Sequence, residues 1–352
     1  MIDWSSSMQQ TYEYYIVDPK TWKDDIKVSN IKSSSIERDS EAETLGSASF
    51  EMGDLIGECY IRVYLVAIQN GITYRYPLGT FLVETPSTKF DGKTHTVSAD
   101  AYTPLKELKE NPPPIGYSLL EKDNILNSAY LLCRENARAP VIKTENDTEL
   151  HNNFVANTND TWLSFISDLV DNASHKLDLD ELGRIIFSPK QDTASLQPVW
   201  TYTDNNSSIL YPEVTVDKDL YEIPNVVEVI YSNGNSSYYA VAVNDDPNSP
   251  ISTVSRGRKV TYRDTNPSLY GSPTEAQTQE YAERLLKEFS TLECKITYSH
   301  GYCPVRLNDC VRLNYTRAGL TDVKARVIKQ SIECGTSCKV TETAIYTTKL
   351  WR

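Results

Sequence analysis

The chain has 352 residues, of which 39% are hydrophobic, and a formal net charge of −13 at pH 7. This length allows two or three domains with their own cores, and no apolar run approaches the ~18–20 residues of a membrane-spanning helix. The N-terminal residues lack the basic and apolar segments of a secretory signal, so we expect synthesis in a cytoplasm and no membrane span.

Charge and aromatic residues are distributed unevenly. Residues 251–352 contain 16 Lys and Arg against 10 Asp and Glu, whereas residues 1–250 contain 19 against 38. An acidic surface repels the phosphates of nucleic acid and so disfavours binding DNA or RNA through phosphate contacts. It is compatible with a channel wall past which DNA moves, and also with a surface that only keeps the protein soluble. The 23 Tyr against 7 Phe suit half-exposed strands and subunit interfaces.

The first predicted block, residues 11–102, is mainly β-strand. Segments rich in β-branched and aromatic residues, such as CYIRVYLVAI, alternate with polar turns. Asn70-Gly71 and Asp91-Gly92 offer the positive φ that tight hairpin turns need. We predict a hairpin at each dipeptide within an antiparallel barrel or sandwich. Because the apolar residues of YIRVYLVAI hardly alternate with polar ones, we expect burial on both of its faces.

The pattern changes to a helical insert after Thr103-Pro104. Three prolines at 112–114 predict a stiff, extended spacer. Residues 124–136 place apolar side chains on one helical face, and a second helix is predicted to begin with Asp160 as its N-cap. A short hairpin, 176–180 with 184–188, is expected next. The Ser-, Thr- and Asn-rich residues 191–211 are interpreted as a linker.

Strands return from Val214 to the C-terminus, with a single helix predicted over about 272–290. Ser272-Pro273-Thr274-Glu275 is typical of a capping box with Pro at the first helical position. The later segments CKITYSH, DCVRLNY, VKARVIKQSIE and CKVTETAIY are again typical of strands. The plan of long strands and hairpins is therefore the same as in the first block.

The seven cysteines include one weak zinc candidate, the set Cys303, Cys310, Cys334 and Cys338. Their spacings, with six and three intervening residues, match no usual zinc knuckle. A structural zinc, a disulfide and free thiols on strands all stay open, and free thiols are the favoured interpretation.

The sequence contains no recognisable catalytic motif. The four histidines form no metal-binding pair, and neither a nucleophile elbow nor a phosphate-binding glycine loop occurs. The 48 Asp and Glu leave a carboxylate pair for glycoside hydrolysis as an open alternative. We therefore predict no catalytic residue, no cofactor and no enzymatic activity.

In this order of segments, the chain resembles the tail hub, or baseplate hub, proteins of tailed bacteriophages. Three stretches carry the resemblance: GTFLVETPSTKFDGKTHTVSADAYTPLKEL, TWLSFISDLVDNASHKLDLDELGRIIFSP and DCVRLNYTRAGLTDVKARVIKQSIECGTSCKVTETAIY. Two departures from the family are the cysteines after residue 290 and the absence of the hydrolase extension that some hub proteins carry.

The resemblance implies a mainly β fold with an α+β insert. Two tube-type antiparallel β-barrel domains, residues 1–105 and 213–352, would flank a small helical domain, residues 106–212. In this family, three copies form a ring of six barrels that matches a six-fold tail tube on one side and a three-fold spike on the other. The hairpins would then supply strands that continue from one barrel to the next.

The resemblance also implies partners and a location. The protein would be a homotrimer in the virion tail, made in the host bacterial cytoplasm. Its neighbours would be a tail tube or distal tail protein, a tip, spike or fibre protein, and a tape measure protein. DNA would pass through the lumen without specific binding. We expect strand residues at the interfaces, namely Tyr60, Tyr64, Phe81, Tyr239, Tyr315 and Tyr346. The alternatives are a tail-associated peptidoglycan hydrolase and a carbohydrate-binding receptor module.

Overall fold

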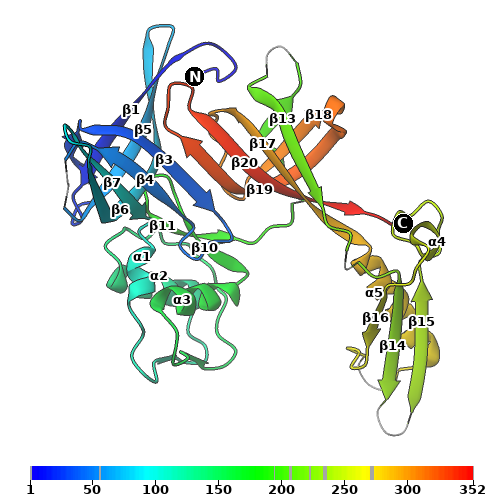
Figure 1. The fold of residues 1–352 in the computed structure, drawn as a ribbon. Helices are drawn as coiled ribbons and strands as arrows, with labels where there is room; N and C mark the ends of the chain where they lie inside the picture. The colour runs from blue at the N-terminus through cyan, green and yellow to red at the C-terminus, as the bar shows by residue number, and fades with distance from the viewer. Residues whose placement is uncertain are drawn as a thin grey trace. The chain divides into compact units, whose positions relative to one another are not determined.

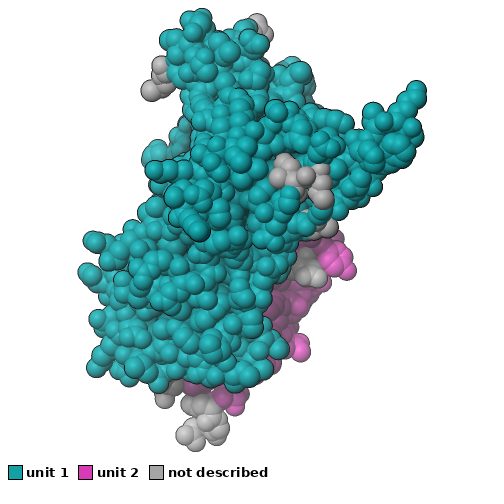
Figure 2. Space-filling view, turned by 90° about the vertical axis from the view of Figure 1, so that its left-hand side faces the viewer, with its two compact units in different colours: residues 1–214, 298–343 teal, residues 215–297, 344–352 magenta. Residues whose placement is uncertain are grey.

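The chain divides into two compact units. Unit 1 comprises residues 1–214 and 298–343, and unit 2 comprises residues 215–297 and 344–352, as Figure 2 shows in two colours. None of the helices described is long and apolar enough to cross a membrane. The structure, a computed structural model, describes residues 2–54, 57–193, 195–205, 208–221, 223–232, 236–269 and 273–351.

Unit 1 begins with a block of antiparallel strands (Figure 1). Strand β5 is buried along nearly its whole length, as predicted. Asn70 and Gly71, with φ of 53° and 77°, connect β5 to β6, and Asp91 and Gly92 connect β6 to β7. Both predicted hairpins are therefore confirmed. The strands are β1 (Gln9–Val17), β2 (Asp24–Val28), β3 (Ile31–Asp39), β4 (Gly46–Met52), β5 (Cys59–Gln69), β6 (Ile72–Phe90) and β7 (His95–Tyr102).

The helical insert follows, and its helices pack on one apolar core with Leu163, Ile166 and Leu169 at its centre. Asn124 caps α2 by accepting a hydrogen bond from the Asn127 amide. For α3 the prediction of Asp160 as N-cap is wrong, because Thr161 caps it in a capping box with Ser164. The elements are α1 (Lys106–Glu110), β8 (Ser118–Leu119), α2 (Ile125–Asn136), β9 (Phe154–Val155), α3 (Trp162–Asp171), β10 (His175–Leu179) and β11 (Ile185–Pro189).

The insert hairpin formed by β10 and β11 is attached to the first block by its turn. The Leu182 carbonyl accepts hydrogen bonds from Trp22 Nε1 at 2.8 Å, Thr80 Oγ1 at 3.0 Å and Arg62 Nη2 at 3.1 Å. Gly183 follows with φ of 72°, and a Cβ built there would lie 2.7 Å from Thr80 Cβ. Only glycine fits this backbone conformation and this close approach without strain.

A second block of strands lies partly in unit 1, and by residue number β13, β17 and β20 cross the bounds of this unit at 214, 298 and 343. The interpretation of residues 191–211 as a linker needs correction, because residues within it form β12, which pairs parallel with β18. A 3-10 turn, Thr316–Ala318, lies between β18 and β19. The strands are β12 (Trp200–Thr203), β13 (Leu210–Lys218), β17 (Thr291–Gly301), β18 (Cys310–Tyr315), β19 (Leu320–Glu333) and β20 (Lys339–Lys349).

The two blocks are joined edge to edge in one sheet. Strand β19 of the second block pairs antiparallel with β3 of the first, from Lys329 opposite Asp39 to Glu333 opposite Ser35. The main path of the sheet runs β13-β17-β20-β19-β3-β4-β7-β6-β5-β1-β2, and β18 and β12 branch from β19. Among the described residues, backbone hydrogen bonding therefore continues from one block into the other.

Unit 2 is a two-layer arrangement of a small sheet and a helix. Strand β14 lies between antiparallel β15 and parallel β16. One face of the sheet packs on α5 through Val227, Val229, Ala240 and Ala242. The elements are β14 (Val226–Ser232), β15 (Ser237–Val243), α4 (Thr253–Arg256), β16 (Thr261–Asp264) and α5 (Glu275–Phe289).

Helix α5 confirms the predicted helix, but it begins differently. Thr274 is the N-cap, and its hydroxyl accepts from the Gln277 amide while the Gln277 side chain accepts from the Thr274 amide. The predicted capping residue Ser272 lies outside the described residues, and Pro273 precedes the cap instead of occupying the first helical position.

Candidate functional site

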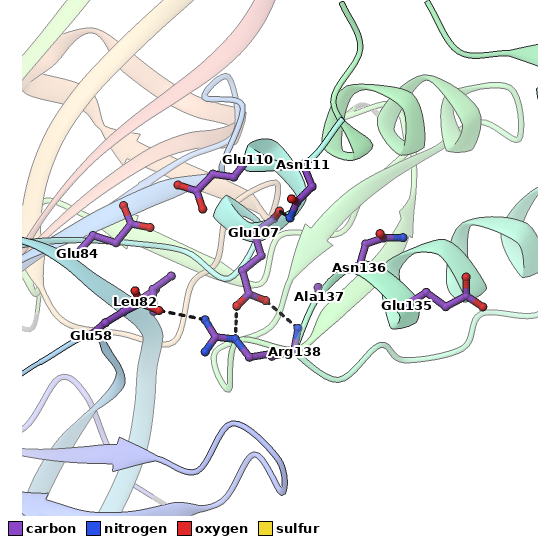
Figure 3. Close-up of a pocket in the computed structure, with 10 residues that line it drawn as sticks. All are labelled: Glu58, Leu82, Glu84, Glu107, Glu110, Asn111, Glu135, Asn136, Ala137 and Arg138. Carbon is purple, nitrogen blue, oxygen red and sulfur yellow. Dashed lines mark hydrogen bonds and ion pairs between the residues drawn. The ribbon is translucent and has the colours of Figure 1, made fainter. Parts of the chain in front are cut away.

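An acidic pocket lies in unit 1 where the first block meets the helical insert (Figure 3). Its volume is about 410 Å³, within the ~300–1,000 Å³ range of pockets that bind small groups. Glu84 comes from β6, Glu107 and Glu110 come from α1, and Glu135 comes from the last turn of α2. The charged lining residues are Glu58, Glu84, Glu107, Glu110, Glu135 and Arg138.

Two cations compensate the carboxylates of the pocket in part. Arg138 donates through its backbone amide and its Nε to Glu107, and its Nη2 lies 3.5 Å from Glu58 (Figure 3). Lys106 Nζ lies 3.7 Å from Glu84 and 3.4 Å from Glu110. Five glutamates thus face two cations. The Glu58 and Glu110 side chains keep 65% and 52% of their surface exposed, so they are open to a further cation.

Tyr60 of β5 lies beside the Glu107–Arg138 wall of the pocket. The Arg138 guanidinium is 5.1 Å from the centre of the Tyr60 ring. Tyr60 is 1% exposed, and within the described residues its hydroxyl is the one buried side-chain polar atom without a hydrogen-bond partner. Burial first, and then the Glu107 carboxylate, raise the pKa of Tyr60. A buried hydroxyl with no partner is costly, and Glu107 and Arg138 are the polar groups that lie nearest to it.

A second cluster of polar side chains lies inside the second block. His300 Nε2 is 3.3 Å from Glu342 Oε2, and Tyr298 donates to the same oxygen at 2.6 Å. Tyr202 donates to it at 3.2 Å. Gln330 Nε2 donates to the other carboxylate oxygen at 2.7 Å. His300 and Glu342 are both fully buried, so the carboxylate is held by a buried cation and three hydrogen-bond donors.

The network extends to the first block through Arg38 of β3. Arg38 Nη1 donates to Gln330 Oε1 at 3.0 Å, and its Nη2 donates to the Leu78 carbonyl at 2.6 Å. Gln330 therefore contacts Arg38 with one end of its amide and Glu342 with the other. This route runs beside the β3–β19 joint, and it adds side-chain hydrogen bonds to those of the backbone.

The electrostatics of this network favour an ion pair. Burial alone would lower the pKa of His300, but the Glu342 charge and Cys303 outweigh it and raise the pKa to about 10. Burial alone would raise the pKa of Glu342, but the His300 charge and the hydrogen bonds from His300, Tyr298 and Gln330 lower it. At neutral pH both groups are charged. Because neither side chain reaches solvent, the network is suited to holding strands together and not to acting on a substrate.

From the sequence, His300 counts only as one of four histidines that form no metal-binding pair, and Glu342 is assigned no role. The alternation of buried and exposed residues along the strands nevertheless indicates these two residues. Val340, Glu342 and Ala344 occupy the buried positions of β20, so the period-two pattern places a carboxylate in the core. A buried carboxylate requires a partner, and His300 lies at a buried position of β17.

The four cysteines of the zinc candidate lie in different surroundings. Cys303 contacts the Tyr202 hydroxyl at 3.3 Å in the buried network. Cys310 lies buried in β18, and Cys334 and Cys338 flank the turn between β19 and β20. All four are free thiols. Within the described residues, no group of three or more His, Cys, Asp or Glu is arranged to hold a metal ion.

The six expected interface residues differ in exposure. Tyr239 on β15 is 58% exposed and Tyr346 on β20 is half-buried. An interface role for these two remains a prediction. The other four side chains are already covered within the folded chain, so the single subunit offers little of their surface to a partner: Tyr60, Tyr64, Phe81 and Tyr315.

This chain is similar to known proteins in its structure. No protein-family model and no curated protein sequence matches the chain. The structure is similar to the tail protein from Neisseria meningitidis MC58, with a TM-score of 0.62 and 12% identity over 96% of this chain and 97% of that one. It is also similar to the 43 kDa tail protein of prophage MuSo2 from Shewanella oneidensis, with a TM-score of 0.59 and 12% identity over 95% and 98%.

A third similar structure is a chain of the Francisella PdpA-VgrG complex, with a TM-score of 0.54 and 10% identity over 97% of this chain and 53% of that one. At these identities the likeness concerns the fold. The predicted fold class is confirmed, and so, at the level of the fold, is the resemblance to phage tail proteins.

Proposed function

We propose that this chain, which has the fold of phage tail proteins, is a homotrimeric tail hub. It would join a six-fold tail tube to a three-fold tip or spike in the virion tail. The observation that carries the proposal is the antiparallel pairing of β3 with β19, which joins two β-blocks of one subunit in one sheet. Three such subunits supply six β-blocks, the number needed to match a six-fold tube.

The likeness to two tail proteins over at least 95% of this chain supports the proposal. Because the structural likeness also extends over 97% and 98% of those two proteins, it includes both β-blocks and the insert. We further propose the tail tube or distal tail protein, the tip, spike or fibre protein and the tape measure protein as neighbours. The domain boundaries at 1–105, 106–212 and 213–352 belong to the same proposal.

The charge distribution supports a conduit role. Residues 1–250 contain twice as many acidic as basic residues, 38 against 19. An acidic wall repels the phosphates of DNA. We propose that DNA passes the ring without specific binding, and that the barrels themselves, and not a catalytic site, perform the function.

Light scattering across a dilution series tests the oligomeric state. With 39.8 kDa per chain, the proposal predicts a stable species at about three times this mass, because obligate interfaces of this kind bury on the order of thousands of Å². The same dilution series is also measured with purified tail tube protein added. A chain that stays monomeric at every concentration, with and without the tube protein, would contradict the proposal.

A further inference from the structure

Unit 2 presents a basic loop between α4 and β16. Helix α4 ends at Arg256, and Gly257, with φ of 62°, turns the chain so that Arg258 and Lys259 are exposed. Among the described residues neither Arg258 nor Lys259 has an ion-pair partner. Burial first, and then the charge of the nearby Arg258, lower the pKa of Arg256. Uncompensated charge of this kind favours a negatively charged partner.

The loop is held rigidly by a buried asparagine. Asn225 is fully buried, and its Nδ2 donates to the carbonyls of Ile251 and Arg258 at 3.0 Å each. Its Oδ1 accepts from the Val260 amide at 2.8 Å. Both sides of the loop are thus fixed to the core of unit 2. A preordered loop loses little conformational entropy when it binds.

The acidic pocket of unit 1 has the complementary properties. Its five glutamates exceed its cations, and the carboxylates of Glu58 and Glu110 are largely exposed. The Tyr60 hydroxyl is buried and is not part of the pocket lining, so the carboxylates supply the attraction for an incoming N–H donor. A volume of about 410 Å³ accommodates the end of a Lys or Arg side chain.

We propose that the acidic pocket of one subunit receives the basic loop, Arg258 and Lys259, of a neighbouring copy of this chain. The inference rests on the proposed trimer, because a closed ring brings different surfaces of identical chains together. A second copy is favoured as the occupant because the same chain carries both surfaces, one acidic and one basic. Charge complementarity across such a contact fixes the register between subunits and disfavours wrong pairings.

Charge reversal tests the contact in the full chain. One variant combines Glu58→Lys with Glu110→Lys, and a second combines Arg258→Glu with Lys259→Glu. Because like charges would then face one another, each is expected to raise the dissociation constant of the trimer at least about ten-fold in sedimentation or light scattering. The quadruple variant restores opposite charges and is expected to return within about three-fold of the wild type.

The matched control reverses two exposed glutamates of the insert, Glu121→Lys with Glu145→Lys, which lie outside the pocket. It changes the net charge equally and is expected to leave the trimer intact. Circular dichroism melts verify that every variant folds.

The possible outcomes of this experiment distinguish the pocket–loop contact from the hub proposal. Reversed variants that remain trimers, a control that dissociates equally, or a quadruple variant that is not restored would each overturn the pocket–loop contact while leaving the hub proposal standing. A wild-type chain that forms no trimer would instead contradict the hub proposal itself.

Discussion

At the scale of single residues, the most demanding feature is the buried pair of His300 and Glu342. Taking both charges out of water is costly, and the cost is offset only by close geometry and additional hydrogen bonds. Here Tyr298, Tyr202 and Gln330 all donate to the carboxylate. Removing one partner of such a pair leaves the other charge buried and uncompensated, which is more damaging than losing an exposed ion pair.

Glu342→Gln is therefore expected to lower the free energy of unfolding by about 3–5 kcal/mol, because it keeps the shape of the side chain but removes the charge that faces His300. Denaturant titration measures this change. The control is Glu333→Gln, whose ion pair with Lys339 at 3.8 Å is on the surface and whose loss is expected to cost less than about 1 kcal/mol. Equal effects of the two substitutions would contradict the account of the network.

The same pair predicts how stability depends on pH. The pKa of His300 is raised to about 10 from an ordinary value of 6.5, so its contribution is complete below pH 6.5 and is lost as the pH rises through about 10. The pKa of Glu342 is lowered from 4.5, so its contribution is complete above pH 4.5 and is lost as the pH falls through the lowered value.

The stability difference between the wild type and Glu342→Gln is thus expected to be largest between pH 4.5 and 6.5 and to shrink towards pH 10. Unfolding titrations at a series of pH values measure it. A difference that grows from pH 6.5 to pH 10 would mean that His300 is not the charged partner.

At the scale of elements, the turn of the β10–β11 hairpin determines how the insert is attached. Its Leu182 carbonyl accepts three hydrogen bonds from the first block, and its Glu181 forms an ion pair with Arg306 of the second block. One short turn of the insert therefore contacts both β-blocks within unit 1. A change that displaces this turn is expected to loosen the insert.

Gly183→Ala tests the attachment. The new Cβ would lie 2.7 Å from Thr80 Cβ at a φ of 72°, so the turn must move or become strained, at a cost of about 2–4 kcal/mol. Gly116→Ala is the control, because its φ of 79° is similar but nothing lies within 4 Å of the added Cβ, and about 1 kcal/mol is expected. Thermal or denaturant unfolding compares the two, and equal losses would show that the Thr80 contact is unimportant.

Local signals in the sequence predicted most elements of this chain. The Asn70-Gly71 turn, the helix after Asn124 and the β10–β11 hairpin all follow from residues within a few positions of one another. The N-cap of α3 lies one residue later than predicted, because Asp160 and Thr161 are both good caps and only the backbone geometry decides between them.

Features that depend on distant contacts were not predictable in this way. Strand β12 has only four residues, Trp200–Thr203, and it exists because β18, more than a hundred residues later, pairs with it. The β3–β19 joint and the pairing of His300 with Glu342 likewise join segments far apart in the chain. The acidic pocket draws its glutamates from two helices, strand β6 and the residue that precedes β5, so no spacing in the sequence indicates it.

At the scale of the whole molecule, the proposed hub function depends on regular β-structure. The sheet continues between blocks within one subunit through β3 and β19, and a ring requires similar continuity between subunits. The pocket of unit 1 and the basic loop of unit 2 would fix the order of subunits in such a ring.

Electron microscopy of the purified protein, with the tail tube protein added where it is needed for assembly, determines whether the chain forms the proposed three-fold ring. We expect a ring with three-fold symmetry in which six β-blocks surround an open channel wide enough for duplex DNA. Particles of two-fold symmetry, or compact particles without a central channel, would contradict it.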